Sequence, residues 1–102
     1  MSDTPSRPTP LSRHAVMALL DEAMAQAALS RVSGTNAGQG PSRTVVAVDV
    51  HMSFMRPATG QPVASAQVVG GGKTMVFCEA QLRDAQGELL AQALGTYRAQ
   101  SL

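Results

Sequence analysis

The stretch that decides the fold is Val46-Ala47-Val48-Asp49-Val50-His51-Met52-Ser53-Phe54-Met55-Arg56-Pro57. Its even-numbered positions from 46 to 54 are all apolar, whereas positions 49, 51 and 53 are polar. Alternation with a period of two is typical of a β-strand that buries one face, here the face of the even-numbered residues. Proline cannot donate a hydrogen bond to a neighbouring strand, so we expect this strand to end before Pro57.

Four strands are expected in all, the first formed by this stretch and the other three on its C-terminal side. The alternation predicts strands at about 44–55, 62–69, 74–83 and 88–98. In the third of these, Cys78 alternates with apolar residues and is therefore expected in the core. The segment Asp84-Ala85-Gln86-Gly87 is predicted to form a short hairpin turn, because Gly87 can adopt the positive φ that such turns need.

One amphipathic helix is expected before the strands, at about 10–31. Thr9 before Pro10 resembles an N-cap with proline at the first helical position, and Ser12 is a second candidate cap. At 100° per residue the helix presents one apolar stripe, made of Val16, Met17, Leu20, Met24, Ala27 and Ala28. Asp21 lies at the margin of this stripe, whereas Glu22 points away from it.

Composition limits the possible partners and locations. The 102 residues suit one domain, expected at 9–102, with a disordered tail at 1–8 and a glycine-rich loop at 33–43. A net charge of +1 and only three aromatic residues give no case for nucleic acid. No apolar run is long enough to span a membrane, and no signal peptide is recognised. The single cysteine, Cys78, excludes an internal disulfide and fits a reducing compartment, so the cytosol is expected.

Three segments, in this order and at this spacing, resemble the hotdog-fold acyl-CoA thioesterase superfamily, especially its phenylacetate-degradation type. Residues 18–24 resemble the central helix with its acidic residue, 48–58 the long strand after it, and 84–97 the closing hairpin. The resemblance implies an α+β hotdog fold, in which an antiparallel β-sheet is wrapped around one long central helix.

Two features depart from the family pattern. Family members usually carry a further segment before the helix, commonly with an extra strand, so the chain resembles an N-terminally short member. Their helix usually opens with His-Gly-Gly nine positions before the acid, and here those positions are Ser12-Arg13-His14.

The resemblance also implies a site and a substrate. Asp21 would activate water or attack an acyl-CoA thioester, while backbone amides near 13–15 at the helix start would polarise the carbonyl. These positions lie about 10–13 Å apart along one helix, so the resemblance implies a site shared between two subunits. No metal or cofactor is expected. The expected substrate-binding residues are Ser12, Arg13, His14, Arg56, Gly71, Gly72 and Lys73, with Arg43 a further candidate for the phosphates of coenzyme A.

Other interpretations of the same residues stay open. Asp21 can be a helix-surface acid that reaches water, and 70–73 can be a plain turn without a ligand. His51 shares a strand face with Asp49 and Ser53, which fits a polar sheet face or a polar subunit contact better than a catalytic triad. His14 can equally be exposed and inert.

Two alternative functions and an oligomeric state are predicted as well. The alternatives to a thioesterase are a non-catalytic acyl-CoA or acyl-lipid binding protein, and a fragment that dimerises without a ligand. A single open sheet has edges that invite pairing, so we expect a homodimer or homotetramer.

Overall fold

The structure, a computed structural model, describes residues 9–33 and 43–101. The expected disordered tail at 1–8 and nearly all of the expected loop lie outside the described residues. The elements follow in the order α1 (Arg13–Ser33), β1 (Arg43–Phe54), β2 (Val63–Gly71), β3 (Met75–Arg83) and β4 (Leu89–Ser101).

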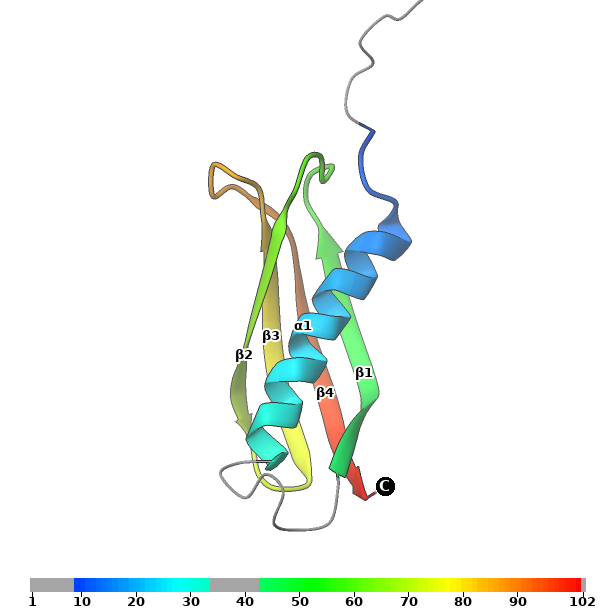
Figure 1. The fold of residues 1–102 in the computed structure, drawn as a ribbon, viewed down its shortest axis with the longest axis vertical. Coiled ribbons are helices and arrows are strands. Elements are labelled where there is room, and N and C mark those ends of the chain that lie inside the picture. Colours follow the sequence, from blue (N-terminus) through cyan, green and yellow to red (C-terminus); the bar gives the residue numbers. More distant parts are fainter. Residues whose placement is uncertain (1–8, 34–42, 102) are drawn as a thin grey trace, which may run out of the picture.

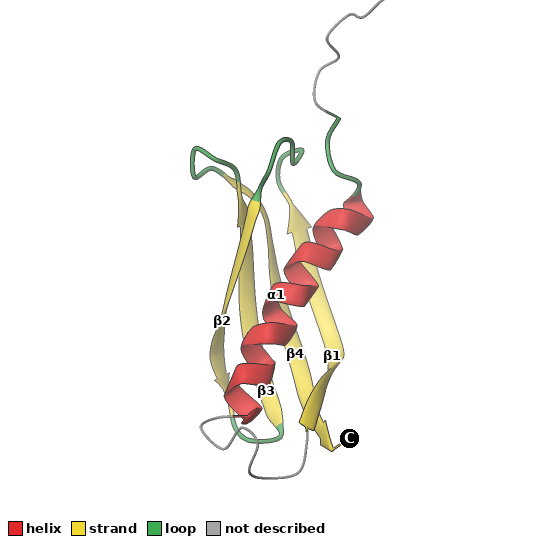
Figure 2. Ribbon diagram, viewed as in Figure 1, coloured by secondary structure: helices red, strands yellow, loops and turns green. Residues whose placement is uncertain are grey.

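The four strands form one antiparallel sheet in the order β1-β4-β3-β2, and α1 lies diagonally across one of its faces (Figure 1; Figure 2). The helix contacts every strand. This arrangement confirms the predicted α+β hotdog fold. Because β4 and β3 are central, β1 and β2 are the edge strands of the described sheet.

Small residues on the central strand allow the helix to approach the sheet closely. The helix-facing side of β4 carries Ala91, Ala93 and Gly95, all buried. Large apolar side chains of the helix fill the space above them, and Leu20 and Met24 are completely buried. Burying one such side chain contributes roughly 1.5–3 kcal/mol, so this layer accounts for much of the stability of the helix–sheet contact.

A β-bulge corrects the predicted pattern of β1. Pairing with β4 runs from Ala47 opposite Tyr97 directly to Asp49 opposite Thr96, which leaves Val48 as an extra residue that is 52% exposed. The bulge inverts the alternation, so Val45 packs on the core before it and Val50 after it. The expectation of one buried face for all even positions was wrong for the first half of the strand.

The helix begins later than predicted. Its first residue is Arg13, and the Ala15 amide donates to Ser12 Oγ at 3.1 Å, the contact of an N-cap. The Val16 amide donates to the Ser12 carbonyl at 3.0 Å. Ser12 is therefore the cap, and the assignment of this role to Thr9 was wrong.

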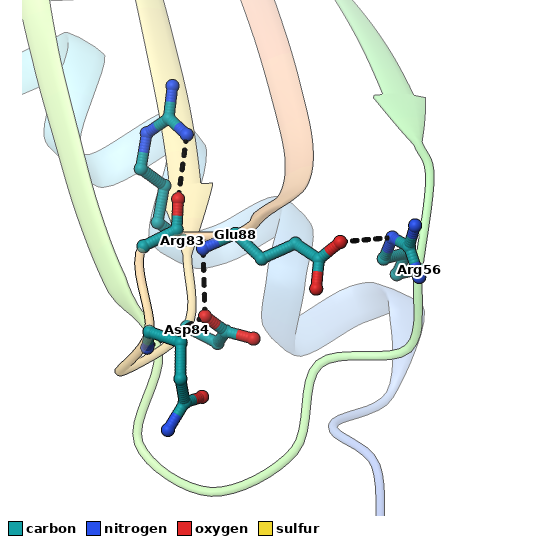
Figure 3. Close-up of polar contacts among 6 residues, drawn as sticks. Arg56, Arg83, Asp84 and Glu88 are labelled. Atoms are coloured by element: carbon teal, nitrogen blue, oxygen red, sulfur yellow. Dashed lines mark hydrogen bonds and ion pairs between the residues drawn. The ribbon is translucent and has the colours of Figure 1, made fainter.

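The turn between β3 and β4 is held by the Asp84 side chain. Asp84 Oδ1 accepts hydrogen bonds from the amides of Gln86 and Glu88, both at 2.9 Å, and Gly87 has a φ of +86°. Arg83 donates to the Gly87 carbonyl, and Arg56 forms an ion pair with Glu88 at 3.0 Å (Figure 3). The hairpin is thereby tied to the segment that follows β1.

Candidate functional site

An apolar groove of about 440 Å³ lies between α1 and edge strand β1. One wall comes from the helix and the other from the strand, on the side of β1 that faces α1. The groove is lined by Met17, Ala18, Asp21, Ala47, Val50, Met52 and Phe54. Asp21 is the only ionisable residue among these lining residues, so the groove presents one carboxylate in apolar surroundings.

Asp21 is half-buried, and its side chain forms a hydrogen bond with a residue of the sheet. Tyr97 is 1% exposed and lies on β4 opposite Ala47, and its hydroxyl donates to Asp21 Oδ1 at 2.5 Å. The same hydroxyl lies 3.3 Å from the Asp21 backbone carbonyl. Both partners of the phenol therefore belong to one residue of the helix.

Burial, the hydrogen bond to Asp21 and the negative charge of that carboxylate together raise the pKa of Tyr97 far above its usual range. The phenol therefore keeps its proton at neutral pH and remains a hydrogen-bond donor. Its partner has the chemistry of a general base or nucleophile, because a carboxylate can accept a proton or attack a carbonyl.

The helix start places one side chain, that of Arg13, beside a residue that lines the groove. The Arg13 guanidinium lies over the Phe54 ring, 5.5 Å from its centroid, and Phe54 also lines the groove. His14 is exposed. The Ala15 amide already donates a hydrogen bond to Ser12. The backbone N–H groups that remain for a ligand at the helix start are therefore those of the first two helical residues, Arg13 and His14.

Within one chain the helix start and Asp21 stay apart. The rise of an α-helix separates positions 13 and 14 from Asp21 by about 10–12 Å along the axis. A thioester carbonyl held at the helix start would therefore lie beyond the reach of the Asp21 carboxylate of the same chain.

The other expected substrate-binding residues lie at opposite ends of the molecule. Arg56 follows β1 at the end where the helix begins, and the Leu11 amide donates to the Ala58 carbonyl there at 2.7 Å (Figure 1). Gly71, Gly72 and Lys73 lie at the other end, where the Arg31 side chain donates to the Gly71 carbonyl at 3.3 Å.

The turn that contains Gly71 and Gly72 is shaped by contacts of its own backbone. The Gly72 amide donates to the Met75 carbonyl at 2.8 Å, so it serves the turn itself. Gly71 has a φ of +108°, and a Cβ on it would lie 2.3 Å from the Met75 carbonyl oxygen. The glycines are thus explained by the geometry of a tight turn, while the exposed Lys73 remains the cationic group beside it.

Several other candidates lie away from the groove. Asp49 and His51 are exposed, and they are not among the residues lining the groove. Cys78 is buried on β3, as expected, and burial raises the pKa of its thiol. Among residues 9–33 and 43–101, no three His, Cys, Asp or Glu side chains are placed to hold a metal ion. No helix in this part of the chain combines the length and apolar character needed to cross a membrane.

Sequence reasoning predicted the strand that carries Tyr97 but missed this residue as the partner of Asp21. The signal was present, because Tyr97 follows Ala91, Ala93 and Gly95 at intervals of two on β4. A large polar-tipped residue on an otherwise small-residue face indicates a buried hydroxyl that needs a partner. Which helical residue meets it could be decided only by the crossing of α1 over the sheet.

The geometry can be compared with solved structures. The BH2602 protein of Bacillus halodurans, solved with CoA, has a TM-score of 0.73 at 22% identity, over 98% of this chain and 67% of its own. Thioesterase HI1161 of Haemophilus influenzae has a TM-score of 0.75 at 18% identity, over 100% of this chain and 64% of its own. PaaI of E. coli, from the phenylacetic acid degradation operon, has a TM-score of 0.71 at 24% identity, over 88% of this chain and 59% of its own.

These structures share the fold of this chain, which spans about two thirds of their length. A comparison with curated proteins gives no match. The thioesterase superfamily model, by contrast, matches residues 15–91, a range that includes α1 from Ala15 onward, the residues lining the groove and the closing hairpin up to Ala91. The chain therefore belongs to the thioesterase superfamily.

Proposed function

We propose that this protein is an acyl-CoA thioesterase that uses Asp21 as its general base or nucleophile. Membership of the thioesterase superfamily supports the reaction, and a neighbour solved with CoA supports the class of thiol. The observation that carries the proposal is the position of Asp21, a single carboxylate in the wall of an apolar groove large enough for an acyl group.

In the general-base form of the reaction, Asp21 removes a proton from water as the water oxygen bonds to the thioester carbonyl carbon. The carbon–sulfur bond then breaks, and the proton passes to the departing thiolate. The products are a carboxylic acid and the free thiol of CoA. In the nucleophilic form, an Asp21 oxygen bonds to the carbonyl carbon, the carbon–sulfur bond breaks, and the CoA thiolate leaves. Water then hydrolyses the resulting anhydride, which restores the Asp21 carboxylate, releases the carboxylic acid and supplies the proton that the thiolate takes up.

A second copy of the chain completes the proposed site. The helix start of one subunit polarises the carbonyl through its backbone N–H groups, and Asp21 of the other subunit reacts. This division follows from the separation of the two groups within one helix, and it requires a homodimer, with a homotetramer as the larger alternative. Ser12 keeps this helix end formed, while Arg13 and His14 lie beside the thioester.

The remaining substrate-binding roles concern coenzyme A. Lys73 is the proposed partner of its phosphates, with Gly71 allowing the nucleotide to lie close to the turn, and Arg56, at the opposite end of the molecule, is an alternative candidate for this role. Arg43, at the start of β1, is a further candidate for the same role. A cytosolic location and catalysis without a cofactor are part of the proposal.

One observation favours a second candidate function, a non-catalytic acyl-CoA or acyl-lipid binding protein. The helix start carries Arg13 and His14 where the family pattern has two glycines, and side chains at these positions reduce how closely a thioester can approach the amides. A protein with such a helix start could retain the groove and bind a ligand without hydrolysing it.

Release of free thiol from a panel of short, long and aromatic acyl-CoAs distinguishes these functions. We expect the wild type to turn over at least one of them, and Asp21→Asn to lower kcat by about 100-fold or more, as for loss of a general base. Glu22→Gln is the matched control, because it removes a carboxylate from the next, exposed position of the same helix.

Each result has a definite meaning. Unchanged turnover in Asp21→Asn contradicts the proposed mechanism. Saturable binding of acyl-CoA by the wild type, without thiol release from any member of the panel, establishes the binding protein instead.

A further inference from the structure

Tyr97 is the only tyrosine of the chain, which also has no tryptophan. Its ring is buried beneath α1, and the hydroxyl has two acceptors within reach, Oδ1 and the backbone carbonyl of Asp21, at 2.5 and 3.3 Å. A phenol has a single proton to donate, and the shorter contact directs it to the carboxylate. Oδ1 is thereby occupied, which leaves Oδ2 as the oxygen available to a molecule in the groove.

The position of the ring is fixed by the backbone of its own strand. Gly95, two residues earlier on the same face of β4, has no side chain, and a Cβ there would lie 2.9 Å from Tyr97 Cε1 and 3.0 Å from Met24 Cε. The ring therefore occupies space that only a glycine at 95 leaves free. A tyrosine placed in this way cannot easily turn its hydroxyl to another partner.

The surroundings contain few other ionisable groups. The β1 residues lining the groove are apolar, and Glu22 of the helix is exposed and does not line the groove. On β3, Cys78 is the titratable residue whose charge contributes to the raised pKa of Tyr97. The hydrogen bond to Tyr97 is thus the main polar contact of the Asp21 side chain among the described residues.

This step rests on the proposed function. We propose that Tyr97 is a positioning residue for the reaction: it donates to Oδ1 of Asp21, fixes the carboxylate against the sheet and leaves Oδ2 directed to water or to the acyl carbon. The raised pKa of Tyr97 agrees with this role, because the phenol stays protonated and donates at every pH at which the enzyme is expected to work.

Because Tyr97 is the only tyrosine, its spectrum reports this one contact. Tyrosine emission is quenched by a hydrogen-bonded carboxylate, so we expect Asp21→Asn to raise the fluorescence at neutral pH, while Glu22→Gln leaves it unchanged. In a titration followed by tyrosinate absorbance, Asp21→Asn is expected to lower the pKa of Tyr97, because the hydrogen bond to the carboxylate and its negative charge no longer raise it, so tyrosinate should begin to form at lower pH than in the wild type. Identical spectra and titrations for wild type and Asp21→Asn would overturn the proposal.

The kinetic test uses Tyr97→Phe, which keeps the ring and removes only the hydroxyl. We expect kcat to fall by about tenfold or more with KM changed less than about twofold, since the hydroxyl orients a reacting group and does not contact the acyl chain. Circular dichroism and urea unfolding establish that the variant is folded. Full kcat in the folded Tyr97→Phe variant overturns the positioning role.

The two proposals fail in different ways. If Asp21→Asn loses turnover and Tyr97→Phe keeps it, the proposed function stands and the role of Tyr97 does not. If Asp21→Asn keeps turnover, the reaction does not use this carboxylate, and Tyr97 has no reacting group to position.

Discussion

At the scale of single residues, Gly95 controls the layer beneath the helix. A methyl group at this position would come within 3.2 Å of both the Tyr97 ring and the Met24 side chain, each of which is fully buried. We therefore expect Gly95→Ala to lower the free energy of unfolding by about 1–3 kcal/mol, as overpacking of a core does. Urea unfolding followed by circular dichroism measures the change.

Gly72→Ala is the matched control for that measurement. A Cβ on Gly72 meets no atom within 4 Å, and its φ is not positive, so the same added methyl group should change stability by less than about 0.5 kcal/mol. Equal stability of Gly95→Ala and wild type would mean that Met24 and Tyr97 move aside freely, and that the ring is not fixed as described.

The residue scale also marks where prediction from sequence stopped. Asp21 could be singled out because the resemblance puts the acidic residue of the family's helix at this position, and its half-buried place in the groove agrees with its position at the margin of the apolar stripe. Its partner Tyr97 lies 76 residues away, and no local pattern relates the two. The pairing depends on which turn of the helix crosses β4, and that crossing is set by packing of the whole layer.

At the scale of elements, the start of α1 depends on Ser12. Its hydroxyl accepts a hydrogen bond from the Ala15 amide, so Ser12→Ala should lower the free energy of unfolding by about 1 kcal/mol. Ser12→Asp keeps an acceptor at the cap and should restore most of this loss. Thr9→Ala, at the rejected cap position, should leave thermal unfolding unchanged; a larger effect at Thr9 than at Ser12 would reverse the assignment.

Elements were predicted well where one period governs the whole segment. The apolar face of β3 alternates without interruption, and Val76, Cys78, Ala80 and Leu82 are all buried as expected. β1 breaks that rule, because the extra residue Val48 is itself apolar and hides the bulge in the sequence. A run of valines on both sides of a register shift satisfies either face, so composition could not reveal it.

At the scale of the whole molecule, one chain holds both halves of the proposed site but keeps them apart. Edge strand β1 forms one wall of the groove and pairs with β4 on one side only among the described strands. Exposed apolar side chains lie on this strand and beside it, including Val48 at 52% and Phe54 at 44%. An unpaired edge with apolar neighbours favours association, in agreement with the proposed dimer.

Mixing two inactive variants tests whether the site is shared between chains. Proline at position 13 or 14 removes one N–H group from the first turn, where proline is tolerated, whereas Arg13→Ala or His14→Ala keeps it. We expect one of these proline variants to lose turnover that its alanine counterpart retains. When this proline variant is mixed with Asp21→Asn and the two exchange subunits, the mixture should show about a quarter of wild-type thiol release. Random pairing makes half of the dimers mixed, and each mixed dimer has one intact site out of two.

The control for the mixing experiment is the proline variant that also carries Asp21→Asn. Paired with Asp21→Asn alone, it leaves no intact site in any dimer, so thiol release should stay at the level of the single variants. If exchange of subunits is demonstrated and the first mixture still shows no gain, the carboxylate and the helix start must serve the same active site from one chain. That outcome would require α1 to bend or the substrate to bridge about 10 Å, and it would contradict the shared site.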